Sequence, residues 1–141
     1  MKAYKFLPHT ADAKFRAYGK TLEKAFENAA YAMTDVITDH KKVKAKVKRV
    51  FEIESEDQKA LLYDFLEKLV ALVDTDSFLL SKVEEIKIKQ VDRGFELKAK
   101  VSGDNVIESY DIKTTIKAVT YQEMEIEHEK EGFMLQVVVD I

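Results

Sequence analysis

The sequence predicts an α+β fold in which two amphipathic helices pack on a mostly antiparallel sheet of six or seven strands. Two segments repeat apolar residues at steps of three and four, which is the period of a helix with one buried face. Most of the remaining chain alternates apolar and charged residues, which is the period of a half-buried strand. Because no linker, internal repeat or low-complexity stretch interrupts the pattern, we expect a single domain spanning residues 1–141.

The first helix is predicted to begin after Thr21, a residue type that caps helix N-termini. Short strands are expected before it at residues 4–7 and 13–18, and Gly19 ends the second of them. The apolar face of the helix consists of Leu22, Ala25, Phe26, Ala29, Met33, Val36 and Ile37. This spacing corresponds to an amphipathic helix of about four turns.

The second helix follows a long strand expected over residues 43–54, whose apolar residues alternate with Lys and Glu. Ser55 followed by Gln58 is a capping-box pattern and predicts the start of the helix. Its apolar face consists of Leu61, Leu62, Phe65, Leu66, Leu69, Val70 and Val73. The polar residues 74–77 are expected to end it.

The remainder of the chain is predicted to form strands, with tight turns at residues 92–94 and 130–132. The expected order is a strand at 78–91, a strand at 95–101, a loop at 102–105, an extended segment at 112–129 and a closing strand at 133–141. We expect the strands from the two ends of the chain to lie close together.

Composition excludes several classes of function. The net charge of -3 argues against strong direct binding to nucleic acid. The chain has no cysteine, which excludes disulfides, thiol catalysis and thiolate metal sites. No apolar run approaches the roughly 20 residues of a membrane span, and the first residues lack the apolar core of a signal peptide. We therefore expect a cytoplasmic protein without a membrane partner.

A lysine-rich segment formed by Lys41, Lys42, Lys44, Lys46, Lys48 and Arg49 has two interpretations. It could contact RNA, or its lysines could protect an edge or outer strand face from pairing with another sheet. Few aromatic residues are interleaved for base stacking, which favours the second interpretation. His40 and His128 lie among charged residues and are expected to be surface residues.

Other kinds of site are not indicated. The four glycines, at positions 19, 94, 103 and 132, are too far apart to form a phosphate-binding loop. No local signature suggests a Ser-His-Asp triad. The three histidines are scattered along the chain, which argues against zinc.

Carboxyl groups at the two ends of the chain form the most distinctive pattern. Asp140 directly follows the apolar run 137–139, and an acidic residue at the end of a buried strand is costly unless something satisfies it. The carboxylate of Ile141 adjoins it, and Asp12 stands at the start of an N-terminal strand. If these strands are neighbours, three carboxyl groups meet and can hold a hard cation. Taken singly, Asp12 is more typical of a turn or cap residue.

The chain resembles the archease family at both ends and in the middle. The N-terminal resemblance is carried by His9-Thr10-Ala11-Asp12, Gly19-Lys20-Thr21-Leu22-Glu23-Lys24-Ala25-Phe26, Ala29-Ala30 and Ala32-Met33. The C-terminal resemblance is carried by Lys117-Ala118-Val119-Thr120-Tyr121 and Asp140-Ile141, and the middle one by Leu61-Leu62, Phe65-Leu66 and Leu69. One departure is Gln122, where many archaeal members have histidine.

The resemblance implies a small α+β protein that activates the RtcB-type tRNA-splicing RNA ligase. By this resemblance the protein is not itself an enzyme; it promotes the guanylylation and multiple turnover of the ligase and broadens its nucleotide use. It also implies a divalent metal, most often calcium with magnesium or manganese as alternatives, bound through Asp12, Asp140 and Ile141. His9 would orient this site or fill a polar corner. Lys117 would contact a ligase phosphate or metal ligand, or lie on a strand face.

Two other functions compete with the activator. The same carboxylates could serve a stand-alone metal-dependent phosphohydrolase, although the sequence shows no evident general base or nucleophile beside them. Alternatively, the protein could be a chaperone-like binding module for RNA-modifying enzymes.

Overall fold

The computed structural model describes residues 2–9 and 11–141, so Thr10 of the predicted N-terminal block lies outside the described residues. The elements run in the order β1 (Tyr4–Leu7), β2 (Asp12–Gly19), α1 (Leu22–Ile37), β3 (Val47–Ser55), α2 (Gln58–Asp76), β4 (Leu79–Val91), β5 (Gly94–Asp104), β6 (Ala118–Glu129) and β7 (Gly132–Asp140). Two short 3₁₀ turns, η1 (His40–Lys42) and η2 (Ile107–Ser109), lie in the connections.

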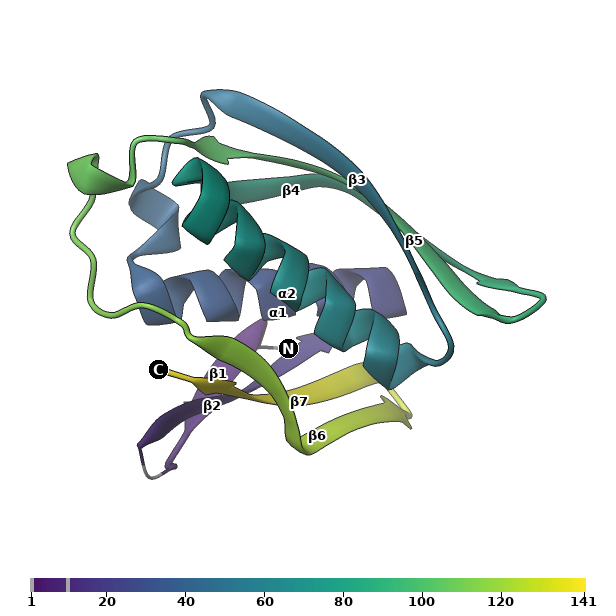
Figure 1. The fold of residues 1–141 in the computed structure, drawn as a ribbon. Helices are drawn as coiled ribbons and strands as arrows, with labels where there is room; N and C mark the ends of the chain where they lie inside the picture. The colour runs from purple at the N-terminus through teal and green to yellow at the C-terminus, as the bar shows by residue number, and fades with distance from the viewer. Residues whose placement is uncertain (1, 10) are drawn as a thin grey trace.

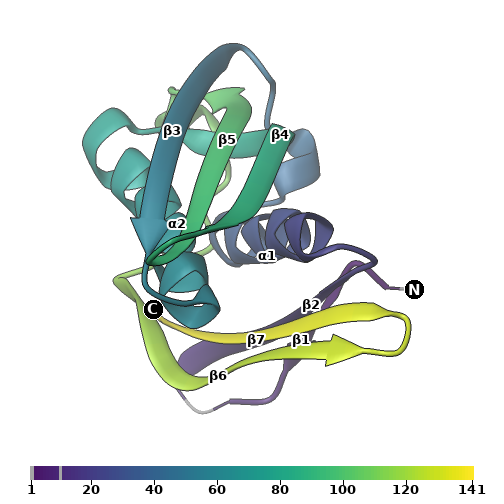
Figure 2. The same cartoon turned by 90° about the vertical axis from the view of Figure 1, so that its right-hand side faces the viewer.

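The strands form two antiparallel sheets with the helices between them (Figure 1). The first sheet has the strand order β1-β2-β7-β6 and the second has the order β3-β5-β4. Figure 2 shows the three layers, in which α1 contacts β2, β7 and β4, and α2 contacts β6, β3 and β5. The predicted α+β class with antiparallel strands is confirmed. The strands belong to two sheets rather than one.

The buried surface of α1 explains this second sheet. Besides the predicted apolar face, α1 buries Ala30, Ala32 and Thr34, which extend the buried surface around the helix. A helix covered on one side buries only a stripe, so this wider surface requires a layer on either side. Alanine suits both exposed and buried helix positions, and the sequence pattern therefore did not reveal the second buried face.

The two helix starts differ in how well they were predicted. Thr21 caps α1 as expected, because its side chain accepts a hydrogen bond from the backbone N–H three residues later, at 3.1 Å. The capping box predicted for Ser55 and Gln58 is wrong, because Asp57 caps α2. Ser55 instead ends β3 and donates its hydroxyl to Asp64 at 2.7 Å.

The strand predicted over residues 43–54 begins only at Val47. The turn η1 ends just before this segment; Val43 has an extended backbone, but residues 43–46 belong to no strand. Val43 is buried and its carbonyl accepts a hydrogen bond from the Ser81 hydroxyl at 2.7 Å. Burial of Val43 therefore comes from a loop contact and not from strand alternation.

The loop predicted at residues 102–105 is also wrong, because β5 continues to Asp104. Gly103 permits this pairing, since a Cβ there would lie 1.9 Å from the Leu79 carbonyl oxygen of β4. Asp104 is buried and accepts a hydrogen bond from the Tyr110 hydroxyl at 2.7 Å. Asp104, one of the polar residues that suggested a loop, is thus satisfied by a residue that follows η2.

The extended segment predicted at residues 112–129 is a regular strand only from Ala118 onward. Its pairing with β7 is interrupted between Thr120 and Glu125. Over this interval residues 121–124 lie opposite a single β7 residue, Val137. The result is a β-bulge, which redirects side chains away from their regular positions.

Strands β2 and β7 are neighbours, so the predicted proximity of the two chain ends is confirmed. Val137, Val138 and Val139 of β7 are fully buried, which fixes the register of the strand that ends at Asp140. Among the described residues, no helix combines the length and the apolar character that crossing a membrane requires.

Candidate functional site

Asp12 is the first residue of β2 and lies directly opposite Asp140, the last residue of β7. Ala118 of β6 lies on the other side of Asp140. Opposite residues of antiparallel strands have Cβ atoms about 4.5–5.5 Å apart and project from the same face. Asp140 is exposed and Asp12 is half-buried. The fold therefore brings the two predicted aspartates together at an accessible end of the first sheet.

The negative charges of these two aspartates repel each other. A hydrogen bond with Asp140 raises the pKa of Asp12, partial burial and the negative charge of Asp140 raise it further, and His9 lowers it. Two carboxylates form such a bond only when one of them holds a proton. The doubly ionised pair is unfavourable unless a positive charge lies between its members.

His9 lies beside this pair and is held from the opposite edge of the sheet. Its Nε2 is 2.9 Å from Oε2 of Glu123, and its Nδ1 is 3.7 Å from Oδ2 of Asp12. The second oxygen of Glu123 accepts a hydrogen bond from Lys14 at 3.2 Å. His9 Nδ1 is buried, and no hydrogen-bond partner for it exists among the described residues.

Glu123 is the residue of this cluster that the sequence reasoning missed. It lies in the β6 bulge with φ of 53°, in the left-handed region that non-glycine residues rarely adopt. Hydrogen bonds from His9 and Lys14 lower the pKa of its carboxyl group. No sequence period marks a bulge, and the nearest signal was the neighbouring departure from the family pattern, Gln122.

Lys117 and Ile141 adjoin the aspartates. The backbone N–H of Lys117 donates to the carbonyl oxygen of Asp140 at 2.8 Å, and the Lys117 side chain is exposed. Ile141 follows the end of β7 and is 37% exposed. Both residues are thus at the same rim as Asp140.

Comparison with known proteins identifies the family. Residues 4–141 match the model of the Archease protein family. The chain belongs to the archease family. Protein archease of Methanosarcina mazei is 43% identical, with 99% of this chain and 97% of that protein covered. Protein archease of Pyrococcus abyssi is 42% identical, with both chains covered completely.

Solved structures agree with this archease assignment. The solution structure of Methanobacterium thermoautotrophicum protein 1598 is 42% identical and superposes with a TM-score of 0.88 over 100% of both chains. An archease from Thermotoga maritima, described as a possible chaperone, is 19% identical and has a TM-score of 0.62 over 97% of this chain and 96% of its own. The second similarity shows the shared archease fold.

The lysine-rich segment does not form one continuous strand face in this archease. Its first residues belong to η1 and the following loop, and its last two lie on β3, an edge strand of the second sheet. Arg49 pairs with Asp76 at 3.5 Å and lies 5.4 Å from the centre of the Phe78 ring. The edge position agrees with the protective interpretation. Weak direct RNA binding stays a prediction.

His40 is not the plain surface residue that its charged neighbours suggested. It is half-buried, its Nδ1 is 2.9 Å from Oδ1 of Asp35, and its ring stacks on Tyr31 at 4.8 Å. The Tyr4 hydroxyl also donates to Asp35. This cluster attaches β1 to α1, which is a structural role. His128 is exposed as expected.

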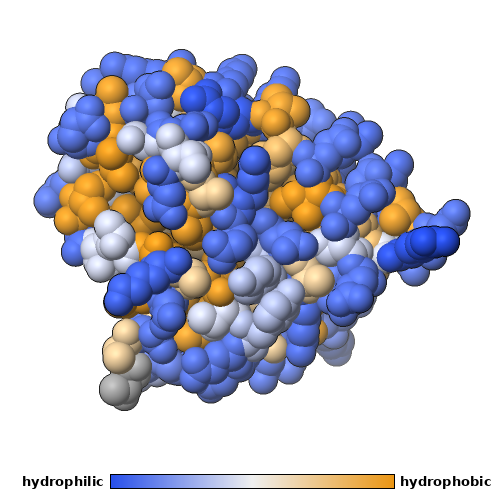
Figure 3. Space-filling view, in the orientation of Figure 1, coloured by the Kyte–Doolittle hydropathy of each residue, from blue (hydrophilic) through white to orange (hydrophobic). Residues whose placement is uncertain are grey.

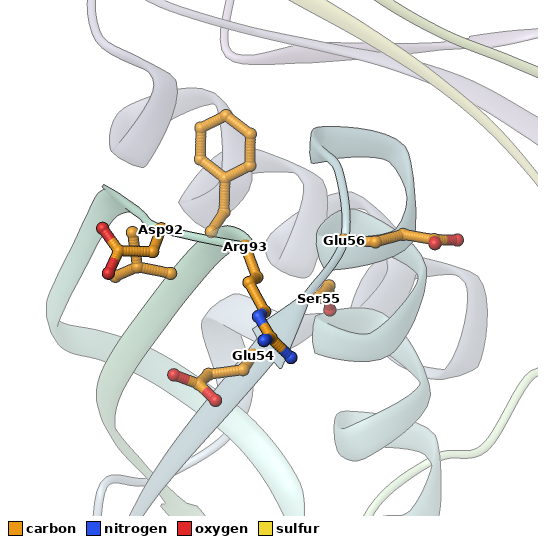
Figure 4. Close-up of a pocket in the computed structure, with 7 residues that line it drawn as sticks. Glu54, Ser55, Glu56, Asp92 and Arg93 are labelled. Carbon is orange, nitrogen blue, oxygen red and sulfur yellow. The ribbon is translucent and has the colours of Figure 1, made fainter.

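A cavity of about 540 Å³ lies elsewhere, between the start of α2 and the β4–β5 turn. Figure 4 shows its charged lining residues Glu54, Glu56, Asp92 and Arg93 together with Ser55. None of the predicted site residues lines it. Its mixture of acidic and basic groups indicates no particular substrate.

Proposed function

We propose that this protein is a non-catalytic activator of an RtcB-type tRNA-splicing RNA ligase, which promotes the guanylylation and multiple turnover of the ligase and broadens its nucleotide use. The observation that carries the proposal is the pairing of Asp12 with Asp140. These residues belong to the two family blocks at opposite ends of the sequence, and they meet at one accessible rim. Membership of the archease family supports the same conclusion.

We also propose a divalent cation at this rim, held by the carboxylates of Asp12 and Asp140 and a main-chain oxygen of Ile141. Oxygen donors suit calcium, magnesium and manganese, and the resemblance favours calcium. The raised pKa of Asp12 supports the fit, because a cation would offset the repulsion between the two carboxylates. No set of three or more His, Cys, Asp or Glu side chains with a metal-binding arrangement occurs in the described part of the chain, so main-chain or water oxygens would have to complete the shell.

The activator would act by presenting this rim to the ligase. A bound cation supplies positive charge for phosphate or carboxylate oxygens of the partner. Asp140 and Ile141 are exposed, so a partner can reach them. The exposed Lys117 side chain adds a second positive group next to Asp140, suited to a ligase phosphate.

The test is ligation by a purified RtcB-type ligase under excess RNA, with and without this protein. We expect more turnovers per ligase with the wild-type protein and no increase with Asp12→Ala or Asp140→Ala. Asp92→Ala is the matched control, because Asp92 is an exposed aspartate in the β4–β5 turn. Equal turnover with and without the wild-type protein would exclude the activator role.

A phosphohydrolase is the second candidate, because His9 with its carboxylate partner Glu123 beside Asp12 resembles an oriented general base. Hydrolysis of simple phosphoesters by the isolated protein, lost in His9→Ala, would favour it over the activator.

A chaperone-like module is the third candidate, suggested by the description of the Thermotoga maritima archease. The exposed large apolar residues Phe6, Val50, Tyr121 and Ile141 lie on different elements. In Figure 3 hydrophilic residues surround the hydrophobic ones across the visible face. Suppression of client aggregation that does not depend on Asp12 would favour this candidate.

A further inference from the structure

We propose that Tyr63 and Tyr121 form an aromatic platform that binds an arginine side chain from a basic segment of a partner protein. Tyr63 belongs to α2, and Tyr121 stands at the start of the β6 bulge. The platform requires no bound ion and neither Asp12 nor Asp140, so it does not rest on the proposed function. It gives the protein a second contact surface, where α2 lies against β6.

The two tyrosine rings are stacked and held in place. Their centres are 4.4 Å apart and their planes are inclined by only 7°. Tyr63 is half-buried and covers one face of the Tyr121 ring, yet Tyr121 is 54% exposed, so its other face is open to a partner. Beside the rings, the Glu67 carboxylate accepts a hydrogen bond from the backbone N–H of Val119 at 2.9 Å, which ties α2 to the neighbouring strand β6 (Figure 1).

The backbone on either side of Tyr121 is also fixed. Tyr121 is the first residue of the interval 121–124 that interrupts the pairing of β6 with β7. The Thr120 hydroxyl donates to the Val138 carbonyl oxygen at 2.8 Å and accepts from the Gln122 N–H at 3.3 Å. An aromatic ring that is ordered before binding loses little conformational entropy when a partner arrives.

Negative charge surrounds the platform. Burial raises the pKa of the Tyr121 hydroxyl, and the negative charges of nearby carboxylates raise it further. These carboxylates belong to Asp64, Asp57 and Glu56, all near the start of α2. Within residues 2–9 and 11–141, none of the three has a Lys, Arg or His partner within 4.0 Å. Their charge is therefore available to a cation from a partner.

The platform is not occupied by a cation of the chain itself. Arg49 lies 5.4 Å from the centre of the Phe78 ring, and Lys68 lies 6.0 Å from the centre of the Phe51 ring. These are the contacts between cations and rings in the part of the chain that the structure describes, and neither involves Tyr121. The open face of its ring is thus free for an arginine from outside.

The ring and the charges together select arginine as the occupant. A guanidinium group is planar, so its face stacks on an aromatic ring while its edge donates hydrogen bonds to carboxylates. The ammonium group of lysine carries the same charge but has no face to stack. A nucleic acid base also stacks on tyrosine, but the carboxylates around the platform would repel its phosphates. An arginine-bearing protein segment complements both the ring and the charge.

The experiment is calorimetric titration of the folded full-length protein with hexaarginine and, separately, with hexalysine at about 0.15 M salt. We expect hexaarginine to bind at least about fivefold more tightly than hexalysine. Tyr121→Ala should remove this preference. Tyr121→Leu should remove it as well, while it keeps apolar bulk against Tyr63 and so protects the fold. Tyr121→Phe retains the ring and should retain the preference for arginine.

Matched controls separate the ring from the charge. Phe6→Ala should leave both affinities unchanged, because Phe6 is 50% exposed on β1, at the opposite edge of the sheet from β6. Glu56→Gln should weaken both peptides about twofold and keep the preference for arginine. Glu131→Gln removes the same charge from the exposed β6–β7 turn and should change neither affinity.

Three results would overturn the platform. They are equal wild-type affinities for the two peptides, no binding of either peptide, and an arginine preference that survives in both Tyr121→Ala and Tyr121→Leu. Tighter binding of hexauridylate than of hexaarginine, lost in Tyr121→Ala, would assign the ring to RNA bases and also overturn the proposal. Asp12→Ala should bind hexaarginine as the wild type does, so failure of ligase activation and failure of this inference are distinct outcomes.

Discussion

Asp12 of β2 lies directly opposite Asp140 of β7, and the backbone of Asp140 is also bonded to the N–H of Lys117 before β6. Three strands therefore meet at one carboxylate-bearing rim. Like charges placed opposite each other in a sheet destabilise it. The arrangement thus affects stability, and this effect can be measured.

Asp12→Asn should stabilise the metal-free protein at neutral pH. The pKa of Asp12 is raised in the folded state, so the stability linked to its protonation is complete below the ordinary value of 3.8 and is lost as pH rises through the higher folded pKa. Asparagine cannot ionise and avoids this loss. Urea denaturation in chelator should give a higher midpoint for the variant at pH 7 and similar midpoints at pH 3. A lower midpoint at pH 7 would contradict the repulsion, and Asp92→Asn controls for general charge effects.

Asp35→Asn should have the opposite dependence on pH. Burial opposes ionisation of Asp35, but hydrogen bonds from Tyr4 and His40 outweigh it and lower the pKa of its carboxyl group. The resulting stability is present above the ordinary value of 3.8 and is lost as pH falls through the lowered pKa. We expect the variant to lose about 1–2 kcal/mol at pH 7, with the loss shrinking below pH 4 in denaturation curves. A loss that is independent of pH would mean that packing, not charge, is responsible.

Ala11→Gly should leave stability unchanged or raise it by up to about 1 kcal/mol. Ala11 precedes Asp12 with φ of 65°, a conformation that glycine adopts without steric cost. Ala13→Gly is the matched control, because Ala13 pairs regularly with Val139 in β2 and should lose roughly 0.5–1 kcal/mol. The measurement is thermal unfolding of both variants in the presence of a chelator. Equal destabilisation of the two variants would rule out relief of backbone strain at residue 11.

A chain extended beyond Ile141 should activate the ligase less well than the wild type. The extension adds bulk beside Asp140 and the main-chain oxygens of Ile141, where the partner is proposed to dock. The same tag placed before Met1 should matter less. Multiple-turnover ligation with the two tagged proteins is the measurement. Equal activity of the two tagged proteins would exclude a role for Ile141 in the proposed site and would leave the roles proposed for Asp12 and Asp140 unchanged.

The sequence alone determined most of the elements. Helical periodicity and the Thr21 cap defined α1, and alternation defined the strands, because these patterns depend on neighbours within a few residues. It also singled out Asp140, because an acidic residue directly after an apolar run is costly unless something satisfies it. Asp12 was added by the expected proximity of the two chain ends and by the resemblance of its block to the archease family. The start of α2 was not determined correctly, because Asp57 caps the helix and Ser55 instead donates its hydroxyl to Asp64.

Tertiary structure decided how those residues become a site. The partition of the strands into two sheets depends on which faces of α1 and α2 are covered, and alanine leaves that open in the sequence. The contact of Glu123 with His9 joins residues 114 positions apart through an irregular bulge that no sequence period encodes. The sequence thus identified the candidate aspartates Asp12 and Asp140. Long-range strand pairing and the β6 bulge determined which residues lie beside them.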